Sequence, residues 1–435
     1  MIELKNGESV SLTNGSQAKV VKELGRGGQG IVYLVEVGGQ KMALKWYFNN
    51  MGNWFYSNLE ENISKGAPSE AFLWPEYLTT KQKGTYGYVM KLRPKDYYEF
   101  GQYLLARAKF KSFEAMVNAA MKICEGFKAL HLSGLSYQDL NDGNFFIHPE
   151  TGDVLICDND NVAPEGVTSG ILGKARYMAP EVVTGKTMPN KYTDRYSLSV
   201  VLFLLFYANH PLEGARVLAC PCMTETYEKK FYGSEPIFIY DKNNSENRPV
   251  RGVHNNVLRR WNAFPALLRD TFIQEFSSVC LHDQNKRKLE RQWQNIIQQL
   301  RDMLVVCPRC KEETFVENPN AAQCMCCGKP FTISGIMKIN DRKILLTPEK
   351  KVYIDMDNKP DIQVISIPGD RYPVQLKNIT TNNWVVETPS GKIKPIEPNK
   401  AMPVKVGLKV SLTGAIKGEI CLLYTSPSPR DRTRS

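Results

Sequence analysis

The stretch "SYQDLNDGNFFIHPETGDVLICDNDNVAP", residues 136–164, spaces two carboxylates and a carboxamide as a single active site would need them. Asp139 precedes Asn144 in the chain, and Asp158 follows an apolar run further on. A phosphoryl transfer from ATP to a hydroxyl needs a carboxylate that orients the hydroxyl and accepts its proton, and oxygen ligands for Mg²⁺. We expect Asp139 to fill the first role, and Asn144 and Asp158 to fill the second.

A glycine-rich loop lies upstream, among strand-like runs that span residues 18–48. Gly25, Gly27 and Gly30 form the pattern G-x-G-x-x-G, and Val32 follows two residues later. The same spacing occurs in dinucleotide-binding folds, where a helix follows the glycines. Here a strand follows, so the sequence indicates a hairpin whose backbone can approach phosphates because side chains are absent.

Lys45 lies on the third of these strands, with Ala43 on the same face because side chains alternate along a strand. An unpaired buried ammonium is costly, so a lysine that points inward is expected to meet an anion. The phosphates of a nucleotide would supply that anion. A structural salt bridge is the alternative.

At these residues the chain resembles the protein kinase family. D-x-x-x-x-N from Asp139 to Asn144 matches the catalytic loop, "CDND" stands where D-F-G is usual, and "YMAPE" contains the A-P-E that ends the activation segment. The resemblance extends roughly from residue 18 to residue 300. It implies an α+β, bilobal fold, with a β-rich N-lobe over residues 1–92 and a helical C-lobe over residues 93–304.

Further positions follow from the same resemblance. Met90 would border the adenine pocket, and the backbone of Lys91–Arg93 would form the hinge, so Arg93 is included in the nucleotide site. Asp194 stands where the family has the aspartate that opens its central buried helix, which accounts for the apolar run "YSLSVVLFLLFYA". Arg287 stands where an arginine commonly pairs with the A-P-E glutamate, here Glu181.

The partner of Lys45 is the least defined of these positions. The family pairs this lysine with a glutamate of the N-lobe helix, which is expected here around residues 54–65. Spacing favours Glu60 over Glu61. A solvated surface position is the alternative for both.

The sequence departs from the family pattern at three places. Tyr137–Gln138 replace the usual His-Arg, which removes the arginine that receives an activation-loop phosphate. Asn141 replaces the lysine that usually follows the catalytic aspartate and contacts the transferred phosphate. Asn159–Asp160 replace Phe-Gly, and Asp160 could compete with Asp158 for the metal. The residues that carry the chemistry are retained, so phosphoryl transfer stays chemically possible.

The retained motifs favour an ATP-dependent kinase that phosphorylates serine or threonine of a protein. Small-molecule kinases of related fold generally lack the A-P-E segment and the helix-opening aspartate, so a protein substrate is favoured over a small molecule. The alternative is a nucleotide-binding pseudokinase scaffold that presents its accessory modules to partners.

Residues 305–331 are dense in cysteines and predict a zinc ribbon. Cys307, Cys310, Cys324 and Cys327 form two C-x₂-C pairs, which can present four thiolates to one tetrahedral Zn²⁺ in a structural site. Cys326 is the spare thiol, and a redox pair is the competing interpretation. So short a segment would take its folding energy from the metal.

Two further stretches complete the chain. Residues 332–420 read as short strands separated by turns, and predict a β-rich accessory domain for peptide recognition or scaffolding. Residues 421–435 begin with "CLLYTSPSPRD", which resembles a translated sequencing adapter and is set aside. Residues 211–265 look like the insertion of bacterial kinases that carry a C-terminal zinc ribbon. That group implies a phosphatase and a von Willebrand-type protein as partners.

The composition of the chain bears on its binding partners and its cellular location. The chain has 435 residues and a formal net charge of +11, which is moderate for this size, and nucleic-acid binding is not favoured. The N-terminus lacks the apolar core of a signal peptide, and the longest apolar run is too short for a membrane span. Eleven cysteines without an export signal indicate a reducing compartment, so we expect a cytoplasmic protein with no membrane contact.

Overall fold

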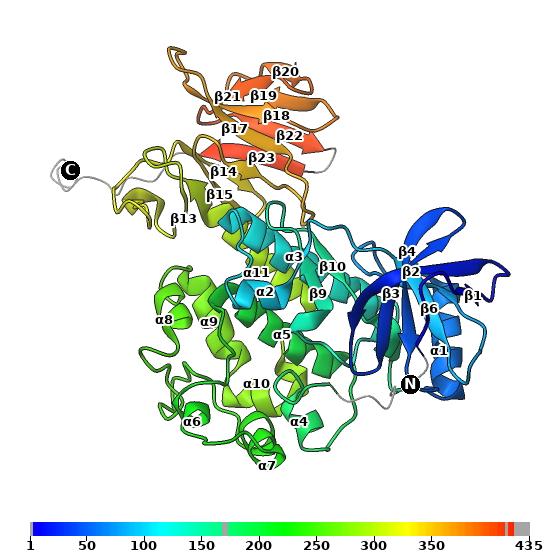
Figure 1. The fold of residues 1–435 in the computed structure, drawn as a ribbon. Coiled ribbons are helices and arrows are strands. Elements are labelled where there is room, and N and C mark those ends of the chain that lie inside the picture. The colour runs from blue at the N-terminus through cyan, green and yellow to red at the C-terminus, as the bar shows by residue number, and fades with distance from the viewer. Residues whose placement is uncertain (1–2, 168–172, 414–415, 422–435) are drawn as a thin grey trace.

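The computed structural model describes residues 3–167, 173–413 and 416–421, and shows two lobes with a β module beside the second lobe (Figure 1). The N-lobe is drawn in blue, the C-lobe runs from cyan to yellow-green, and the β module runs from yellow to red. Among the described residues, no helix combines the length and the apolar character that crossing a membrane requires.

The N-lobe is built on one antiparallel sheet with the strand order β1-β2-β3-β4-β6-β5. Its elements are β1 (Ser9–Ser11), β2 (Gln17–Arg26), β3 (Gly30–Val37), β4 (Gln40–Tyr47), α1 (Asn53–Lys65), β5 (Pro75–Leu78) and β6 (Gly87–Lys91). Gly38 and Gly39 both have positive φ angles and form the two-residue turn between β3 and β4. The strand alternation seen in the sequence therefore gives the hairpins that carry the glycine loop and Lys45.

The C-lobe is mostly helical and surrounds one apolar core. Its elements are β7 (Tyr98–Glu99), α2 (Phe100–Leu104), α3 (Phe113–Leu132), β8 (Leu135–Ser136), β9 (Phe145–Ile147), β10 (Val154–Ile156), β11 (Ala163–Pro164), α4 (Pro180–Val183), α5 (Lys191–Tyr207), α6 (Ala215–Leu218), α7 (Glu225–Glu228), α8 (Asn255–Arg260), α9 (Ala266–Glu275), α10 (Ser278–His282) and α11 (Glu290–Met303).

Two long helices organise this core. α3 begins after Ser112, whose hydroxyl accepts a hydrogen bond from the backbone N–H of Ala115, as expected for an N-cap. α5 contains the apolar run of the sequence, and its side chains from Tyr196 to Tyr207 are all buried. A helix that is apolar on every face must lie inside the molecule, so α5 forms the centre of the lobe.

The cysteine-rich segment and the β module follow α11. The segment contains β12 (Leu304–Val306) and β13 (Glu313–Phe315). The module has two sheets, with the strand orders β15-β14-β23-β22-β19-β20 and β16-β17-β18-β21. Their bounds are β14 (Gly335–Ile339), β15 (Arg342–Leu346), β16 (Lys351–Val352), β17 (Ile362–Ser366), β18 (Val374–Asn378), β19 (Trp384–Glu387), β20 (Ile393–Ile396), β21 (Ala401–Pro403), β22 (Lys409–Thr413) and β23 (Ile416–Cys421).

The β module has a core of its own, in which Trp384 is fully buried. Cys421 ends β23 and pairs with Ile336, so the last strand includes the first residue of the stretch that resembles an adapter. Residues 422–435 lie outside the described part of the chain, and their assignment to an adapter stays a prediction.

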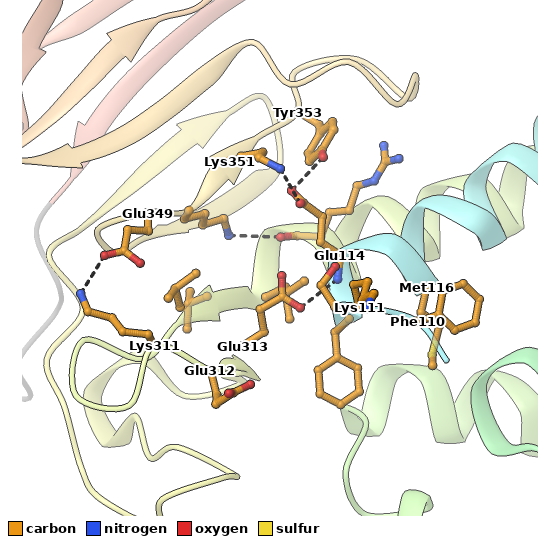
Figure 2. Close-up of a pocket in the computed structure, with 17 residues that line it drawn as sticks. Phe110, Lys111, Glu114, Met116, Lys311, Glu312, Glu313, Glu349, Lys351 and Tyr353 are labelled. Carbon is orange, nitrogen blue, oxygen red and sulfur yellow. Dashed lines mark hydrogen bonds and ion pairs between the residues drawn. The ribbon is translucent and has the colours of Figure 1, made fainter. Parts of the chain in front are cut away.

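Polar contacts join the β module to the C-lobe at the N-terminus of α3. The Glu114 carboxylate accepts hydrogen bonds from Lys351 Nζ and Tyr353 Oη, both at 2.8 Å (Figure 2). The Glu313 carboxylate of the cysteine-rich segment accepts the backbone N–H of Glu114 at 3.0 Å. Three parts of the chain therefore meet around a cavity of about 510 Å³, and the ion pairs Glu114–Lys351 and Lys311–Glu349 lie among its lining residues.

Candidate active site

A cavity of about 1150 Å³ separates the two lobes, and side chains of both lobes line it. It contains most of the residues expected from the sequence: Gly25, Gly27, Gly30, Val32, Ala43, Lys45, Met90, Arg93, Asp139 and Asp158. Asn144 is buried and does not line the cavity, although its neighbour Gly143 does. Glu60 is exposed on α1.

The glycine loop forms the roof of the cavity between β2 and β3. A Cβ atom at Gly30 would lie 2.2 Å from the carbonyl oxygen of Trp46, so no side chain fits there. Gly25 faces open space instead. The N–H of Gly27 donates to the carbonyl of Gly30 at 2.9 Å and closes the turn. The loop thus leaves room for a bulky anion beneath it.

The inner end of the cavity is apolar and suits a flat aromatic base. Val32 and Ala43 come from β3 and β4, and Met90 comes from β6, which pairs with β4 through the Ala43–Met90 register. Arg93 follows β6, and its guanidinium lies over the ring of Phe146 at 4.2 Å from the ring centre. Arg93 thus contacts a ring of β9, and the hinge role of Lys91–Arg93 stays a prediction.

Lys45 forms two ion pairs, neither of them with α1. Its ammonium lies 2.7 Å from Asp160 Oδ2 and 3.4 Å from Asp158 Oδ1. Burial opposes the positive charge, but the charges of Asp160 and Asp158 outweigh it and raise the pKa of Lys45. The pair expected between Lys45 and Glu60 is not formed, because α1 turns Asn58 and Leu59 inward and leaves Glu60 in solvent.

The segment after β10 holds Asp158 in an unusual backbone conformation. Asp158 has φ 55° and ψ 44°, which is the left-handed region, and a short turn from Asn159 to Asn161 follows it. The Asn159 amide donates to the carbonyls of Leu73 at 2.8 Å and Ile156 at 3.0 Å. Asn159 therefore ties the segment to both lobes, and the carboxylate of Asp158 stays half-exposed toward the cavity.

Asp139 lies on the C-lobe side of the cavity among amides. The side chains of Asn141 and Asn161 donate to its carboxylate at 3.5 and 3.4 Å. Burial and the nearby charge of Asp158 raise the pKa of Asp139 to about 6, whereas Lys174 acts in the opposite direction. A carboxylate with such a pKa is suited to accept a proton near neutral pH.

Asn144 and Asp158 offer oxygen atoms that Mg²⁺ prefers. Asn144 Oδ1 accepts the backbone N–H of Asn141 at 2.7 Å, which fixes the side chain at the end of the catalytic loop. A carbonyl oxygen has a second lone pair, so this contact leaves one free for a metal. The donor set therefore fits the ion that the sequence implied.

Asp194 of α5 anchors the backbone of the catalytic loop by hydrogen bonds. The Asp194 carboxylate accepts the backbone N–H groups of Tyr137 at 2.6 Å and Gln138 at 3.1 Å. The same carboxylate contacts His131, whose other ring nitrogen lies 2.9 Å from Glu290. The position of Asp194 expected from the sequence thus has a physical role, because it fixes the backbone that presents Asp139.

Sequence reasoning missed two polar residues of the site and the pairing of a third. Asn161 donates to Asp139, and Lys174 Nζ lies 3.4 Å from Asn141 Oδ1. Asp160, which the sequence suggested as a competitor for the metal, pairs with Lys45. A Cβ at Gly173 would lie 2.9 Å from the Asp139 carboxylate, so this glycine lets the segment of Lys174 approach the catalytic loop. The available signal was a lysine beside a glycine shortly before "YMAPE", in a chain that lacks the catalytic-loop lysine.

The cysteine-rich segment brings its four expected thiols together. The sulfur atoms of Cys307, Cys310, Cys324 and Cys327 all lie within 4.8 Å of one another, and Cys310 and Cys324 are 3.5 Å apart. Tetrahedral zinc with bonds of about 2.3 Å requires sulfurs about 3.8 Å apart. The cluster fits such an ion, and the spare Cys326 is exposed outside it.

Comparisons with known proteins agree with this geometry. A family model described as protein kinase domain matches residues 18–289. Among curated relatives, the probable serine/threonine-protein kinase PknB of Corynebacterium glutamicum is 30% identical over 104 residues, which is 22% of this chain and 16% of the relative. Protein kinase C delta type of Mus musculus is 30% identical over 115 residues, or 25% of this chain and 16% of the relative. The serine/threonine/tyrosine-protein kinase HT1 of Arabidopsis thaliana is 31% identical over 106 residues, or 24% and 27%. The chain thus aligns with about a quarter or less of the length of these relatives.

Proposed function

The chain belongs to the protein kinase family, and from this premise we propose that it transfers the γ-phosphoryl group of ATP to serine or threonine of a protein substrate. The observation that carries the proposal is the placement of Lys45, Asp158 and Asp139 around one cavity beneath the glycine loop. A cation, a metal-binding carboxylate and a proton acceptor are the groups that this reaction requires.

The residues of the chain act by positioning and by charge. Lys45 binds the phosphates of ATP, and the backbone of the glycine loop covers them from above. Asp139 orients the acceptor hydroxyl and takes its proton as the new bond to phosphorus forms. Asn144 and Asp158 would hold Mg²⁺, which when bound neutralises part of the phosphate charge.

Lys174 supplies a charge that the catalytic loop lacks. Asn141 occupies the place of the usual lysine, and the ammonium of Lys174 lies 3.4 Å from its amide oxygen. The amide nitrogen of the same Asn141 donates to the Asp139 carboxylate, so Lys174 is close to the place where the acceptor hydroxyl would bind. We assign it the contact with the transferred phosphoryl group.

The four-cysteine cluster is proposed to bind one structural Zn²⁺. Its thiols saturate a tetrahedral ion and leave no open position for chemistry. Through Glu313 the segment contacts the N-terminus of α3, so the metal would stabilise the junction with the β module. A phosphatase and a von Willebrand-type protein as partners, and a cytoplasmic location, stay predictions from the resemblance and the sequence.

An assay of phosphoryl transfer tests the main proposal. The whole chain is incubated with labelled ATP, Mg²⁺ and a generic protein acceptor, and Asp139→Asn serves as the matched variant. We expect incorporation into serine or threonine by the wild type and a loss of at least a hundredfold in the variant. Equal background incorporation in both, with MgATP still bound in calorimetry, would favour the pseudokinase scaffold instead.

A further inference from the structure

The N-lobe helix of this chain does not present a carboxylate to Lys45. Throughout its described length α1 buries Phe55, Asn58, Leu59 and Asn62, whereas both of its glutamates are exposed. Protein kinases rely on a lysine–glutamate pair between strand and helix to hold the phosphate-binding lysine in place. Some other group must therefore hold Lys45 here.

Asp160 has the position and the environment for this task. Its side chain is fully buried, and its Oδ2 atom lies 2.7 Å from Lys45 Nζ. The hydroxyl of Tyr47 donates to the same oxygen at 2.6 Å. A buried carboxylate needs a counter-ion and hydrogen bonds, and residues of β4 supply both at Oδ2, whereas Oδ1 is also buried and has no hydrogen-bond partner among the described residues. The contacts of Oδ2 are the ones that link Asp160 to Lys45.

We propose that Asp160 is the positioning residue of Lys45 and replaces the helix glutamate in that role. The inference rests on the proposed function, because it concerns the lysine that binds ATP. Asp158 and Asp160 belong to one short segment, so a single piece of chain sets both the metal-binding carboxylate and the phosphate-binding ammonium.

The hydrogen bonds made by α1 also support the assignment of Asp160, and not α1, as the partner of Lys45. The side-chain amides of Asn58 and Asn62 donate to the carbonyl of Val162 at 2.8 and 2.9 Å. α1 thus holds the segment from outside through neutral hydrogen bonds and leaves the charge of Lys45 to Asp160. An outward shift of α1 would break these bonds without removing the counter-ion of Lys45.

The first test compares charge-neutral variants of three acids. Asp160→Asn keeps the shape of the side chain and removes its charge, and Glu60→Gln and Glu61→Gln do the same on α1. We expect Asp160→Asn to lower kcat at least tenfold, and each α1 variant to change it less than twofold. The reverse pattern, with a large loss in Glu60→Gln or Glu61→Gln and none in a folded Asp160→Asn, would overturn the proposal.

A double-mutant cycle with Lys45→Met separates positioning from general support of the fold. If Asp160 acts through Lys45, Asp160→Asn weakens MgATP binding in the wild-type background and has no further effect once Lys45 is Met. Additive losses in the two backgrounds would mean that Asp160 acts independently of Lys45. Calorimetric titration with MgATP gives all four affinities.

Stability provides a readout that does not depend on catalysis. Asp160→Asn leaves Lys45 buried without its nearest counter-ion, so its urea midpoint should fall, and Lys45→Met in the same chain should restore part of it. If the wild type transfers no phosphate while this coupling persists, the proposed function fails and the pairing stands. If the coupling is absent in an active enzyme, the pairing fails alone.

Discussion

Arg287 and Glu181 form a two-pronged ion pair, in which Nη1 and Nη2 of the arginine donate to the two carboxylate oxygens at 2.6 and 2.7 Å. The arginine side chain is 1% exposed, so the pair joins the end of the activation segment to the turn before α11 from inside the C-lobe. The pairing was expected from the positions of the two residues in the sequence, and its geometry makes it a structural element with no direct part in the chemistry.

Arg287→Ala should destabilise the C-lobe strongly. The substitution leaves the Glu181 carboxylate without its counter-ion in a mostly buried place, which typically costs about 3 to 5 kcal/mol. Urea denaturation followed by tryptophan fluorescence measures the change. Lys191→Ala is the matched control, because Lys191 and Glu165 are 3.8 Å apart and more exposed, and a loss below about 1 kcal/mol is expected. Similar losses in the two variants would contradict the assigned role.

His131 should make the stability of the C-lobe depend on pH. Its ring lies between Asp194 and Glu290, and although burial acts against the charge, hydrogen bonds to both carboxylates raise the pKa of His131 to about 9. A pKa raised from its unfolded value of 6.5 adds stability that is complete below pH 6.5 and is lost as pH rises toward 9. We expect the free energy of unfolding to fall by on the order of 3 kcal/mol over this window.

His131→Asn provides the comparison for the pH effect. An asparagine can still donate a hydrogen bond but carries no charge, so the variant should be less stable at pH 6 and should show a flatter pH profile. Denaturation series at pH 6, 7, 8 and 9 on both proteins measure the difference. Parallel profiles would show that folding does not shift the pKa of His131.

Removal of zinc should loosen the cysteine-rich segment. One zinc per chain is expected by elemental analysis, and a strong chelator should release it and lower the thermal midpoint of the junction with the β module. Cys310→Ser should lose the metal, because it removes one of the four clustered thiols. Cys326→Ser should keep it, because that thiol is exposed outside the cluster. A folded wild type that contains no metal after expression in zinc-supplemented medium would refute the site.

The sequence predicted those parts of the site whose structure depends on the spacing of residues close together in the chain. The spacing from Asp139 to Asn144 sets a short loop in which Asn141 and Asn144 form a capping box. The glycine loop sets the hairpin between β2 and β3. The buried helix α5 follows from its apolar run alone. In each case the controlling contacts join residues close in the chain or lie within one element.

The rest depends on contacts between distant parts of the chain. Lys45 and Asp160 are brought together only when the lobes pack, and no periodicity distinguishes Asp160 from Glu60 as the partner. The docking of Tyr353 on Glu114 likewise joins a strand of the β module to a helix of the C-lobe. Side-chain alternation shows which face of a strand carries such a residue, but it does not show which charged residue of another element lies opposite that face.

Lys174 provides a last prediction, which links charge to the pH dependence of the reaction. Asp139 must be deprotonated to accept the proton, so kcat/KM should fall as pH drops through about 6, the pKa of Asp139. The positive charge of Lys174 acts to lower that pKa. Lys174→Met should therefore shift the acid limb of the pH profile of kcat/KM to higher pH. It should also lower kcat about tenfold or more, because the contact with the transferred phosphoryl group is lost.

Lys186→Met is the control variant, because Lys186 lies in the C-lobe beyond the A-P-E motif. It should leave both the acid limb of the profile and kcat unchanged. A limb that stays unchanged in Lys174→Met while kcat falls would mean that the lysine contacts the phosphate without acting on Asp139.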